Sequence, residues 1–303
     1  MKKINLNNQD NKRVNSIKKE ASDEWCTPYD VIEKELRHYI KDFANKIIYL
    51  PCDNPLYSNF FKYFYDNFKA FKLRGLIATY LDTKNPKRTD VSLKNGQLNT
   101  LSTPIKGNGS FASAECLNIM LTQADIIITN PPFSLLRKLI DLLRAIKRKF
   151  IILAPYTCID YKVIFQPFKK EELWLGVNDA SIYFHNPHED KVKRVGILWL
   201  QNFRRMRNYN YDFKYHSLKE APHLVLDNNV INFQSYRDVP DNFYRHFYAP
   251  ISMLFYFDYD TFEIVNKPDR ATFQGQELFK RVCFKRKGQK VEVVVPDNQI
   301  KLW

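Results

Sequence analysis

The chain has 303 residues, 45% of them hydrophobic, and its 47 lysines and arginines against 33 acidic residues give a net charge of +14. This length can bury a sizeable core, and the basic excess favours a polyanionic partner, usually nucleic acid, with a solvated basic surface as the simpler alternative. Five scattered cysteines without a CxxC pair exclude a disulfide framework and a metal cluster, and the lack of a signal peptide or of an apolar run of about 18 residues predicts a cytoplasmic protein without a membrane partner.

Residues 1–22 are rich in Asn and Lys, so we expect a disordered basic tail. Short apolar strands and helices then alternate up to residue 203, which is typical of an α/β domain with a doubly wound, mostly parallel sheet. The expected helices cover 28–40, 57–68, 114–123 and 134–148. The expected strands cover 46–50, 75–81, 125–129, 149–155, 172–177, 181–186 and 194–203. The polar residues 84–108 are expected to form mainly a loop, with a β excursion as an open alternative.

The last of these strands follow one another without helices, which predicts an antiparallel hairpin at one edge of the sheet. From residue 204 the composition shifts toward Arg, Asn and Tyr, so we place a boundary between 23–203 and 204–303. The second region holds basic clusters interleaved with tyrosines, a combination suited to gripping phosphates and contacting bases. Its candidate contacts are Arg204, Arg205, Arg207, Lys285, Arg286 and Lys287.

A corner follows the strand at 125–129, where an apolar run ends in Asn130, Pro131, Pro132 and Phe133. Ligands of open α/β sheets bind at the carboxyl ends of the strands, which is where this corner falls. Asn130 offers a side-chain carbonyl as an acceptor, each proline leaves a carbonyl without a competing N–H group, and Phe133 offers a face for stacking. These groups suit a planar ring that carries an amine with two hydrogens.

Such a corner can assist methyl transfer to an aromatic or amide nitrogen. The lone pair of that amine is delocalised, and two acceptors that hold both N–H groups favour the tetrahedral nitrogen that attacks. The same acceptors stabilise the positive charge that develops on nitrogen. Alignment with the methyl donor supplies the rest of the acceleration.

The corner resembles the Asn-Pro-Pro-Phe motif of S-adenosylmethionine-dependent methyltransferases that act on adenine in DNA. Segments between 23 and 290, among them DEWCTPYDVIEKEL, PCDNPLYSNFFKYF and GILWLQNF, follow in order the pattern of EcoRI-type adenine methyltransferases. The resemblance implies a Rossmann-like, class I methyltransferase domain at 23–203 and a target-recognition region at 204–303. It also implies transfer from S-adenosylmethionine to the N6 amine of an adenine flipped out of double-stranded DNA, held by Asn130 to Phe133.

The same resemblance assigns a donor pocket to the segments around the corner. Trp25, Thr27 and Pro28 would line it, and Asp53 would hold the donor's ammonium group. The other residues assigned to this pocket are Asn54, Pro55, Ser58, Asn59 and Phe60 around the methionine end, and Ser110 and Phe111 beside the adenine ring. Simpler alternatives stay open: a core role for Trp25, a turn at Asp53, and helix capping by the Ser58-Asn59 pair.

Three departures from the family pattern affect the donor pocket. A glycine-rich loop is missing, the second strand ends without the usual acid unless Asp82 replaces it, and Ser110 stands where an acid is expected. A hydroxyl accepts a weaker hydrogen bond than a carboxylate does. The departures therefore leave open a catalytically silent DNA-binding subunit that kept the fold.

Two further alternatives concern substrate and partners. An Asn-Pro-Pro corner also serves enzymes that methylate RNA or protein amines, so these substrates stay open. In a restriction-modification setting, a cognate restriction endonuclease acting separately would be a further partner. The protein itself is expected to be a monomer or a weak dimer.

Overall fold

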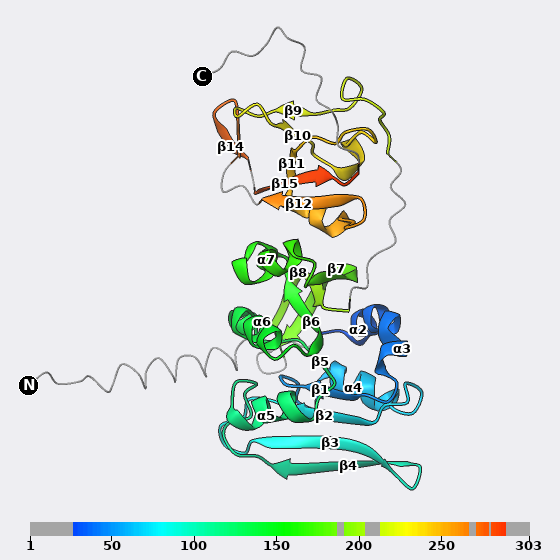
Figure 1. The fold of residues 1–303 in the computed structure, drawn as a ribbon. Helices are drawn as coiled ribbons and strands as arrows, with labels where there is room; N and C mark the ends of the chain where they lie inside the picture. The colour runs from blue at the N-terminus through cyan, green and yellow to red at the C-terminus, as the bar shows by residue number, and fades with distance from the viewer. Residues whose placement is uncertain (1–26, 187–190, 204–212, 267–270, 279, 289–303) are drawn as a thin grey trace, which may run out of the picture. The chain divides into compact units, whose positions relative to one another are not determined.

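The computed structural model describes residues 27–186, 191–203, 213–266, 271–278 and 280–288 (Figure 1). Trp25, the predicted tail at 1–22 and the cluster Arg204, Arg205 and Arg207 lie outside the described residues. The chain divides into two compact units, residues 1–206 and 207–303. Within the described part of the chain, no helix is long and apolar enough to cross a membrane.

The first unit is built on an eight-stranded sheet with the order β4-β3-β2-β1-β5-β6-β8-β7. Its four central strands, β2, β1, β5 and β6, pair in parallel, and the strands outside them pair antiparallel. This arrangement confirms the predicted α/β fold, with antiparallel strands at both edges (Figure 1). The strands are β1 (Ile47–Leu50), β2 (Gly75–Thr79), β3 (Lys87–Lys94), β4 (Gln97–Pro104), β5 (Ile126–Thr129), β6 (Lys149–Pro155), β7 (Trp174–Asn186) and β8 (Lys191–Gln201).

The segment 84–108, expected to be mainly loop, forms the hairpin β3–β4 at one edge of the sheet. Its turn is Asn95-Gly96, where both residues have positive φ, 53° and 75°. An Asn-Gly pair in this conformation is the commonest two-residue hairpin turn. The strands themselves carry little apolar signal because β4 is almost entirely exposed, so only the turn marked them in the sequence.

The other edge is the antiparallel hairpin β7–β8, as predicted. However, the two strands expected at 172–177 and 181–186 are one strand, β7, interrupted by a register shift between Leu175 and Asp179. The polar residues between the two apolar runs form this irregularity and do not end the strand. The break between the two apolar runs is thus a bulge within one strand, where the sequence predicted two separate strands.

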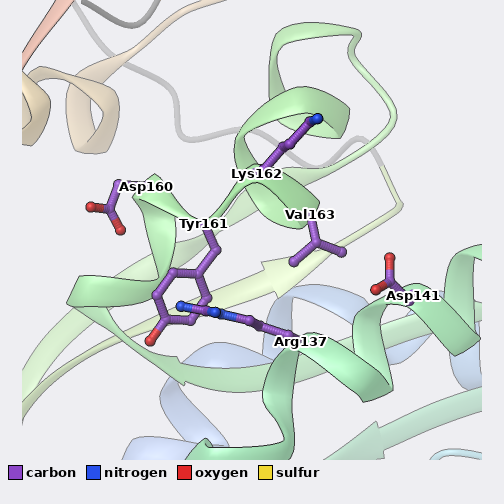
Figure 2. Close-up of a pocket in the computed structure, with 6 residues that line it drawn as sticks. All are labelled: Arg137, Asp141, Asp160, Tyr161, Lys162 and Val163. Atoms are coloured by element: carbon purple, nitrogen blue, oxygen red, sulfur yellow. The ribbon is translucent and has the colours of Figure 1, made fainter. Parts of the chain in front are cut away.

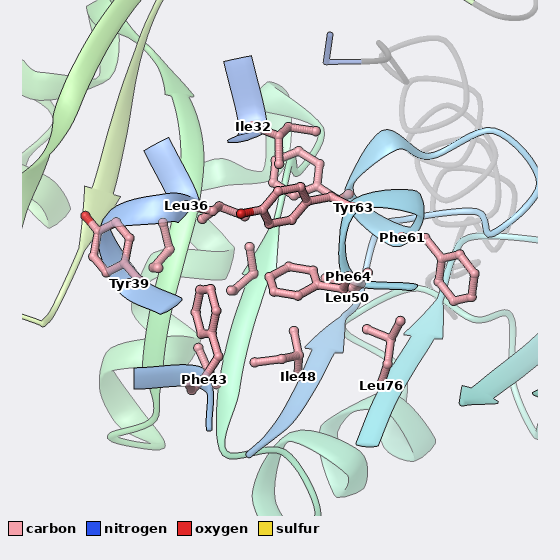
Figure 3. Close-up of a cluster of buried hydrophobic side chains, with 14 of the residues drawn as sticks. Ile32, Leu36, Tyr39, Phe43, Ile48, Leu50, Phe61, Tyr63, Phe64 and Leu76 are labelled. Atoms are coloured by element: carbon pink, nitrogen blue, oxygen red, sulfur yellow. The ribbon is translucent and has the colours of Figure 1, made fainter. Parts of the chain in front are cut away.

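Helices cover both faces of the sheet, α2, α3 and α4 on one side and α5, α6 and α7 on the other (Figure 1). On the first side, rings and aliphatic chains from these helices pack against alternate residues of the strands, such as Ile48 and Leu50 of β1 (Figure 3). On the second side, α6 buries Leu136, Leu139, Ile140 and Leu143 at the spacing that the sequence predicted. The helices are α2 (Tyr29–Leu36), α3 (Ile40–Phe43), α4 (Asn59–Asp66), α5 (Ala114–Thr122), α6 (Leu136–Ala145) and α7 (Lys162–Lys169).

The second unit holds a five-stranded sheet, in the order β12-β15-β11-β10-β9, and a two-stranded ribbon, β13–β14. Its core is aromatic: Phe233 meets Phe243 and Phe247 edge-on, with ring centroids 5.3 Å apart in both pairs. The strands are β9 (Leu224–Val225), β10 (Ile231–Asn232), β11 (Phe247–Pro250), β12 (Phe262–Asn266), β13 (Ala271–Phe273), β14 (Gln276–Leu278) and β15 (Arg281–Arg286). Short 3₁₀ helices complete the two units: η1 (Arg37–Tyr39), η2 (Phe133–Leu135), η3 (Tyr156–Asp160), η4 (Tyr236–Asp238) and η5 (Ile251–Tyr256).

Candidate active site

Asp53 joins three parallel strands of the large sheet at their carboxyl ends. It follows β1 and is buried, with 5% of its surface exposed. Its backbone N–H group donates to the carbonyl of Thr79, the last residue of β2, at 3.1 Å. Its Oδ2 accepts a hydrogen bond from the hydroxyl of Thr129, the last residue of β5, at 2.6 Å. One buried aspartate therefore connects the carboxyl ends of β1, β2 and β5, which is where the site was predicted.

The start of α4 is attached to the same carboxylate. Ser58 caps this helix by accepting from the N–H group of Phe61 at 3.3 Å, while its hydroxyl donates to Asp53 Oδ1 at 2.8 Å. The next residue, Asn59, donates from Nδ2 to the carbonyl of Thr27 at 2.8 Å. Four residues assigned to the donor pocket thus form two hydrogen-bonded pairs, Asp53–Ser58 and Thr27–Asn59, which adjoin at the Ser58-Asn59 peptide bond; we call these four residues the donor group.

Thr27 brings a buried hydroxyl to this group. The residue is 2% exposed, and among the residues that the structure describes no group forms a hydrogen bond with its Oγ1. Buried side-chain polar atoms normally have a partner. A bound ligand is one such partner, so the position fits the donor pocket assigned to it.

A pocket of about 390 Å³ lies against the loop between β1 and α4. Three residues assigned to the donor, Pro55, Ser58 and Asn59, line it. Asn54 shapes this loop: its side-chain oxygen accepts from the N–H group of Leu56 at 3.0 Å and closes a local turn. The other lining residues are Leu56, Tyr57, Phe61, Lys62, Tyr65 and Asp66.

Two aromatic residues assigned to the donor lie in the core. Phe60 and Phe111 are each 2% exposed, and Phe60 packs edge-on against Trp199 at a centroid distance of 5.9 Å. Neither ring presents an open face to a ligand in this structure. A sequence pattern does not separate buried rings from ligand-facing rings, because both appear in it as aromatic residues.

The loop before α5 packs against the end of β2. Gly109 has a φ of 74°, and a side chain there would overlap the carbonyl oxygen of Tyr80. The Cys116 Sγ of α5 lies 3.4 Å from Thr79 Oγ1 and 3.5 Å from the Gly109 carbonyl oxygen, so its single S–H group can donate to either. Ser110, which follows this glycine, is half-buried. The loop therefore lies at the same sheet edge as Asp53, through their shared neighbour Thr79.

Asp82, the candidate replacement for the missing ribose acid, closes a turn. Its Oδ1 accepts from the N–H groups of Lys84 and Asn85 at 2.9 and 3.0 Å. These hydrogen bonds lower the pKa of the Asp82 carboxyl below its usual value. The carboxylate is thus ionised near neutral pH and is held beside the Asn108 loop, whose carbonyl accepts from the Asp82 N–H group at 2.9 Å.

The corner at 130–133 follows directly after Thr129. Asn130 is half-buried, with its Oδ1 enclosed, and Pro131 and Pro132 are buried. Phe133 begins η2 and is half-buried against the core on the α2–α4 side. Because Thr129 donates to Asp53, the corner and the donor group meet at one hydrogen-bonded junction.

Comparison with known proteins shows which family this chain belongs to. The family model for the adenine-specific methyltransferase EcoRI matches residues 13–300. The chain is 33% identical over 294 residues to the Type II methyltransferase M.EcoRI of Escherichia coli, covering 85% of this chain and 90% of that protein. It belongs to the EcoRI family of adenine-specific methyltransferases.

Other similar proteins include the Type II methyltransferase M.MgeORF184P of Mycoplasma genitalium, 40% identical over 206 residues, with 62% of this chain and 64% of that protein covered. A putative RNA methyltransferase from Pyrococcus horikoshii is 12% identical, with a TM-score of 0.36, 62% of this chain and 89% of that chain covered. The family confirms the resemblance drawn from the sequence and makes the chain a DNA adenine methyltransferase. A methyltransferase needs a methyl donor, and the group around Asp53 is the candidate place for it.

The DNA contacts predicted at the end of β15 and directly after it differ in exposure. Lys287 is exposed, and Lys285 is half-buried with its Nζ 3.8 Å from Glu263. Arg286, in contrast, is 7% exposed. Its guanidinium lies 4.2 Å from the ring centre of Phe213 and 5.1 Å from that of Phe262, and donates to the Pro240 carbonyl at 3.0 Å. In this methyltransferase Arg286 thus packs inside the second unit, which a basic cluster in the sequence does not indicate.

Two residues of the junction were missed by the sequence analysis. Thr79 and Thr129 end buried strands and are themselves fully buried. The available signal was a hydroxyl residue as the last member of an apolar run, because a polar group at that position needs a partner at the strand ends. Within the described residues, no group of three His, Cys, Asp or Glu side chains is placed to hold a metal.

Proposed function

We propose that this DNA adenine methyltransferase takes its methyl group from S-adenosylmethionine and transfers it to the N6 amine of an adenine flipped out of double-stranded DNA. The observation that supports this most is the junction at Asp53. It links Ser58 of the donor group to Thr129, which precedes the Asn130 corner, through hydrogen bonds of 2.8 and 2.6 Å. Donor and acceptor of the methyl group would then be aligned by one carboxylate.

The donor would be held by the residues of the donor group. Asp53 carries the negative charge that suits an ammonium group, although both its oxygens already accept from hydroxyls, at Ser58 and Thr129. Each carboxylate oxygen has a second lone pair to offer. The enclosed hydroxyl of Thr27 would gain a partner. When bound, S-adenosylmethionine supplies an electrophilic methyl group.

The target amine would be held by the corner. Asn130 Oδ1 and the Pro131 backbone carbonyl accept hydrogen bonds from the two N–H groups of the adenine amine, and Phe133 stacks on the ring. Both acceptors would stabilise the positive charge that develops on nitrogen as its bond to the methyl carbon forms and that carbon's bond to the donor's sulfur breaks, leaving a neutral thioether. A proton then leaves the nitrogen, so that a neutral methylamine remains. No side chain has to remove a proton before the attack.

The second unit would bind the duplex and recognise its sequence. An adenine inside a duplex cannot reach a corner of this kind, so it must leave the stack. Lys285 and Lys287 are the described candidates for phosphate contacts, together with the arginine cluster at Arg204, Arg205 and Arg207, which lies outside the described residues. We leave Arg286 out of this set because it is buried.

Asn130→Ala tests the proposed catalytic role. We expect kcat for labelled methyl transfer to duplex DNA to fall by at least about a hundredfold, because one of two acceptors for the developing charge is lost. Duplex affinity, measured by fluorescence anisotropy, should change little. Asn118→Ala, at an exposed position of α5, is the matched control. Retained activity in Asn130→Ala would contradict the assigned role.

The donor and the substrate need separate measurements. Calorimetry with S-adenosylmethionine, with and without DNA, should show binding, and its absence in both conditions would contradict the proposed donor. Labelled transfer to DNA, RNA and protein in parallel should give product only with DNA. Long-read sequencing of a genome with and without this protein would then give the methylated sequence.

A further inference from the structure

A second pocket, of about 420 Å³, lies between α6 and the segment that joins η3 to α7. It is lined by Arg137 and Asp141 of α6 and by Asp160, Tyr161, Lys162 and Val163 (Figure 2). None of these residues belongs to the donor group or to the corner. The volume is within the range of small-ligand sites, roughly 300–1,000 Å³.

The centre of this pocket is an arginine stacked on a tyrosine. The guanidinium carbon of Arg137 lies 3.9 Å from the ring centre of Tyr161, and Figure 2 shows the arginine side chain lying across that ring. Stacking of this kind stabilises the cation and holds its flat group in one orientation. The N–H edge of such a group then remains available for a planar, bidentate contact with an anion.

The pocket is lined by segments that follow β5 and β6, and the corner also follows β5. Arg137 is in the first turn of α6, which follows Asn130 after η2, and Tyr161 precedes α7, which follows β6 after η3. Strands β5 and β6 are parallel neighbours, so both segments leave the sheet at the same edge. Neither α6 nor α7 has a side-chain cap at its N-terminus, and the N–H groups of an uncapped first turn favour a nearby anion.

The pocket also carries acceptors. Asp141 and Asp160 stand on opposite sides of the stacked pair (Figure 2). With Lys162 and Arg137 they give two cations and two anions, so a simple anion has no net electrostatic preference for the pocket. A nucleotide offers both kinds of partner: a phosphate for the cations, and base amines that a carboxylate can accept from.

We propose that this pocket binds the nucleotide that adjoins the target adenine on the same strand. Arg137 and Lys162 contact its backbone phosphate, and Asp141 or Asp160 accepts from an amine of its base. This inference rests on the proposed function, because it requires a DNA strand that enters the corner. It adds a contact in the catalytic unit that reads the base beside the target.

Arg137→Ala and Lys138→Ala form a matched pair, because each removes one exposed cation from α6 and only Arg137 lines the pocket. The rate of methyl transfer would be measured for the wild type and both variants, on duplexes that contain the target sequence found by long-read sequencing. We expect kcat/KM for Arg137→Ala to fall at least about tenfold, the loss of one good charged contact, and Lys138→Ala to change less than about twofold. Affinity for S-adenosylmethionine should be equal in both variants and in the wild type.

A neutral methylphosphonate placed at each backbone position in turn would locate the contact. Next to the target adenine it should slow the wild type about tenfold and slow Arg137→Ala no further, because the contact is already missing. Equal slowing of both proteins at that position, or a position elsewhere at which the wild type is slowed and Arg137→Ala is not, would overturn the inference while leaving the proposed function intact. A wild type that methylates no DNA would overturn both.

Discussion

Asp53 is buried, and its carboxylate accepts hydrogen bonds from the hydroxyl groups of Ser58 and Thr129. A buried carboxylate is normally paired with positive charge or strongly hydrogen-bonded. Here Ser58 and Thr129 supply two hydrogen bonds, which is enough to orient the group. A carboxylate held in this way suits both a structural junction and the proposed contact with an ammonium group.

Asp53→Asn separates these two roles. The amide oxygen still accepts from one hydroxyl, and the other hydroxyl can turn to accept from the amide, so the urea midpoint should change little. Loss of the charge should lower the affinity for S-adenosylmethionine at least about tenfold, measured by calorimetry. Asp260→Asn, an exposed acid of the second unit, is the control. Normal donor affinity in Asp53→Asn would leave the residue with a structural role alone.

At the scale of the elements, α2 is fixed to the irregular part of β7 by Glu35. This fully buried carboxylate accepts from the backbone N–H groups of Val177 and Asn178 at 2.9 and 2.7 Å, and from the hydroxyl of Tyr39 at 2.9 Å. Gly176 makes room for it, because a side chain there would overlap Glu35 Oε1. The interruption of β7 thus presents the N–H groups that hold α2 in place.

Glu35→Gln tests this link through its pH dependence. Burial raises the pKa of Glu35 above its usual value, more than its hydrogen bonds lower it. The folded state then binds the proton more tightly than the unfolded chain, so stability declines as pH rises from the unfolded pKa through the folded one. In Glu35→Gln an NH₂ group faces a backbone N–H donor, so the variant should be less stable than the wild type by about 1–3 kcal/mol. This difference in stability should narrow as pH rises, because only the wild type loses stability through the titration of Glu35.

Urea unfolding at a series of pH values measures both effects. Glu33→Gln, at an exposed position of the same helix, should keep the wild-type stability and its pH dependence. A gap between the wild type and Glu35→Gln that widens with pH would contradict the raised pKa.

The elements also show what a sequence can reveal about this fold. The parallel centre was predictable, because buried strands such as β5 read as apolar runs and α6 carries a clear apolar face. The hairpin β3–β4 was not, since its strands are polar and only Asn95-Gly96 marked it. The corner at Asn130 was predictable from chemistry, but the hydrogen bond from Thr129 to Asp53 joins residues 76 positions apart and needed the fold.

At the scale of the whole molecule, the net charge of +14 predicted a polyanionic partner but not which cations face it. Strand β15 is the clearest case. Arg281 and Arg286 are both buried in the second unit, and Arg281 donates to Asn232 Oδ1 at 2.9 Å. Burial lowers the pKa of Arg281. Aromatic faces and carbonyls can thus hold arginines inside a unit, and a charge count in the sequence cannot separate these from surface cations.

Lys287→Ala and Arg286→Met should therefore behave in opposite ways. Lys287 is exposed, so its loss should weaken duplex binding and reduce the slope of log affinity against log salt by about 1, with an unchanged melting temperature. Arg286→Met removes the stacking on Phe213 and Phe262 and the hydrogen bond to Pro240, so the melting temperature should fall while the salt slope stays the same. Anisotropy titrations of one duplex at several salt concentrations, beside thermal melts, measure both quantities. A reduced salt slope in Arg286→Met with an unchanged melting temperature would contradict this prediction and indicate that Arg286 contacts DNA.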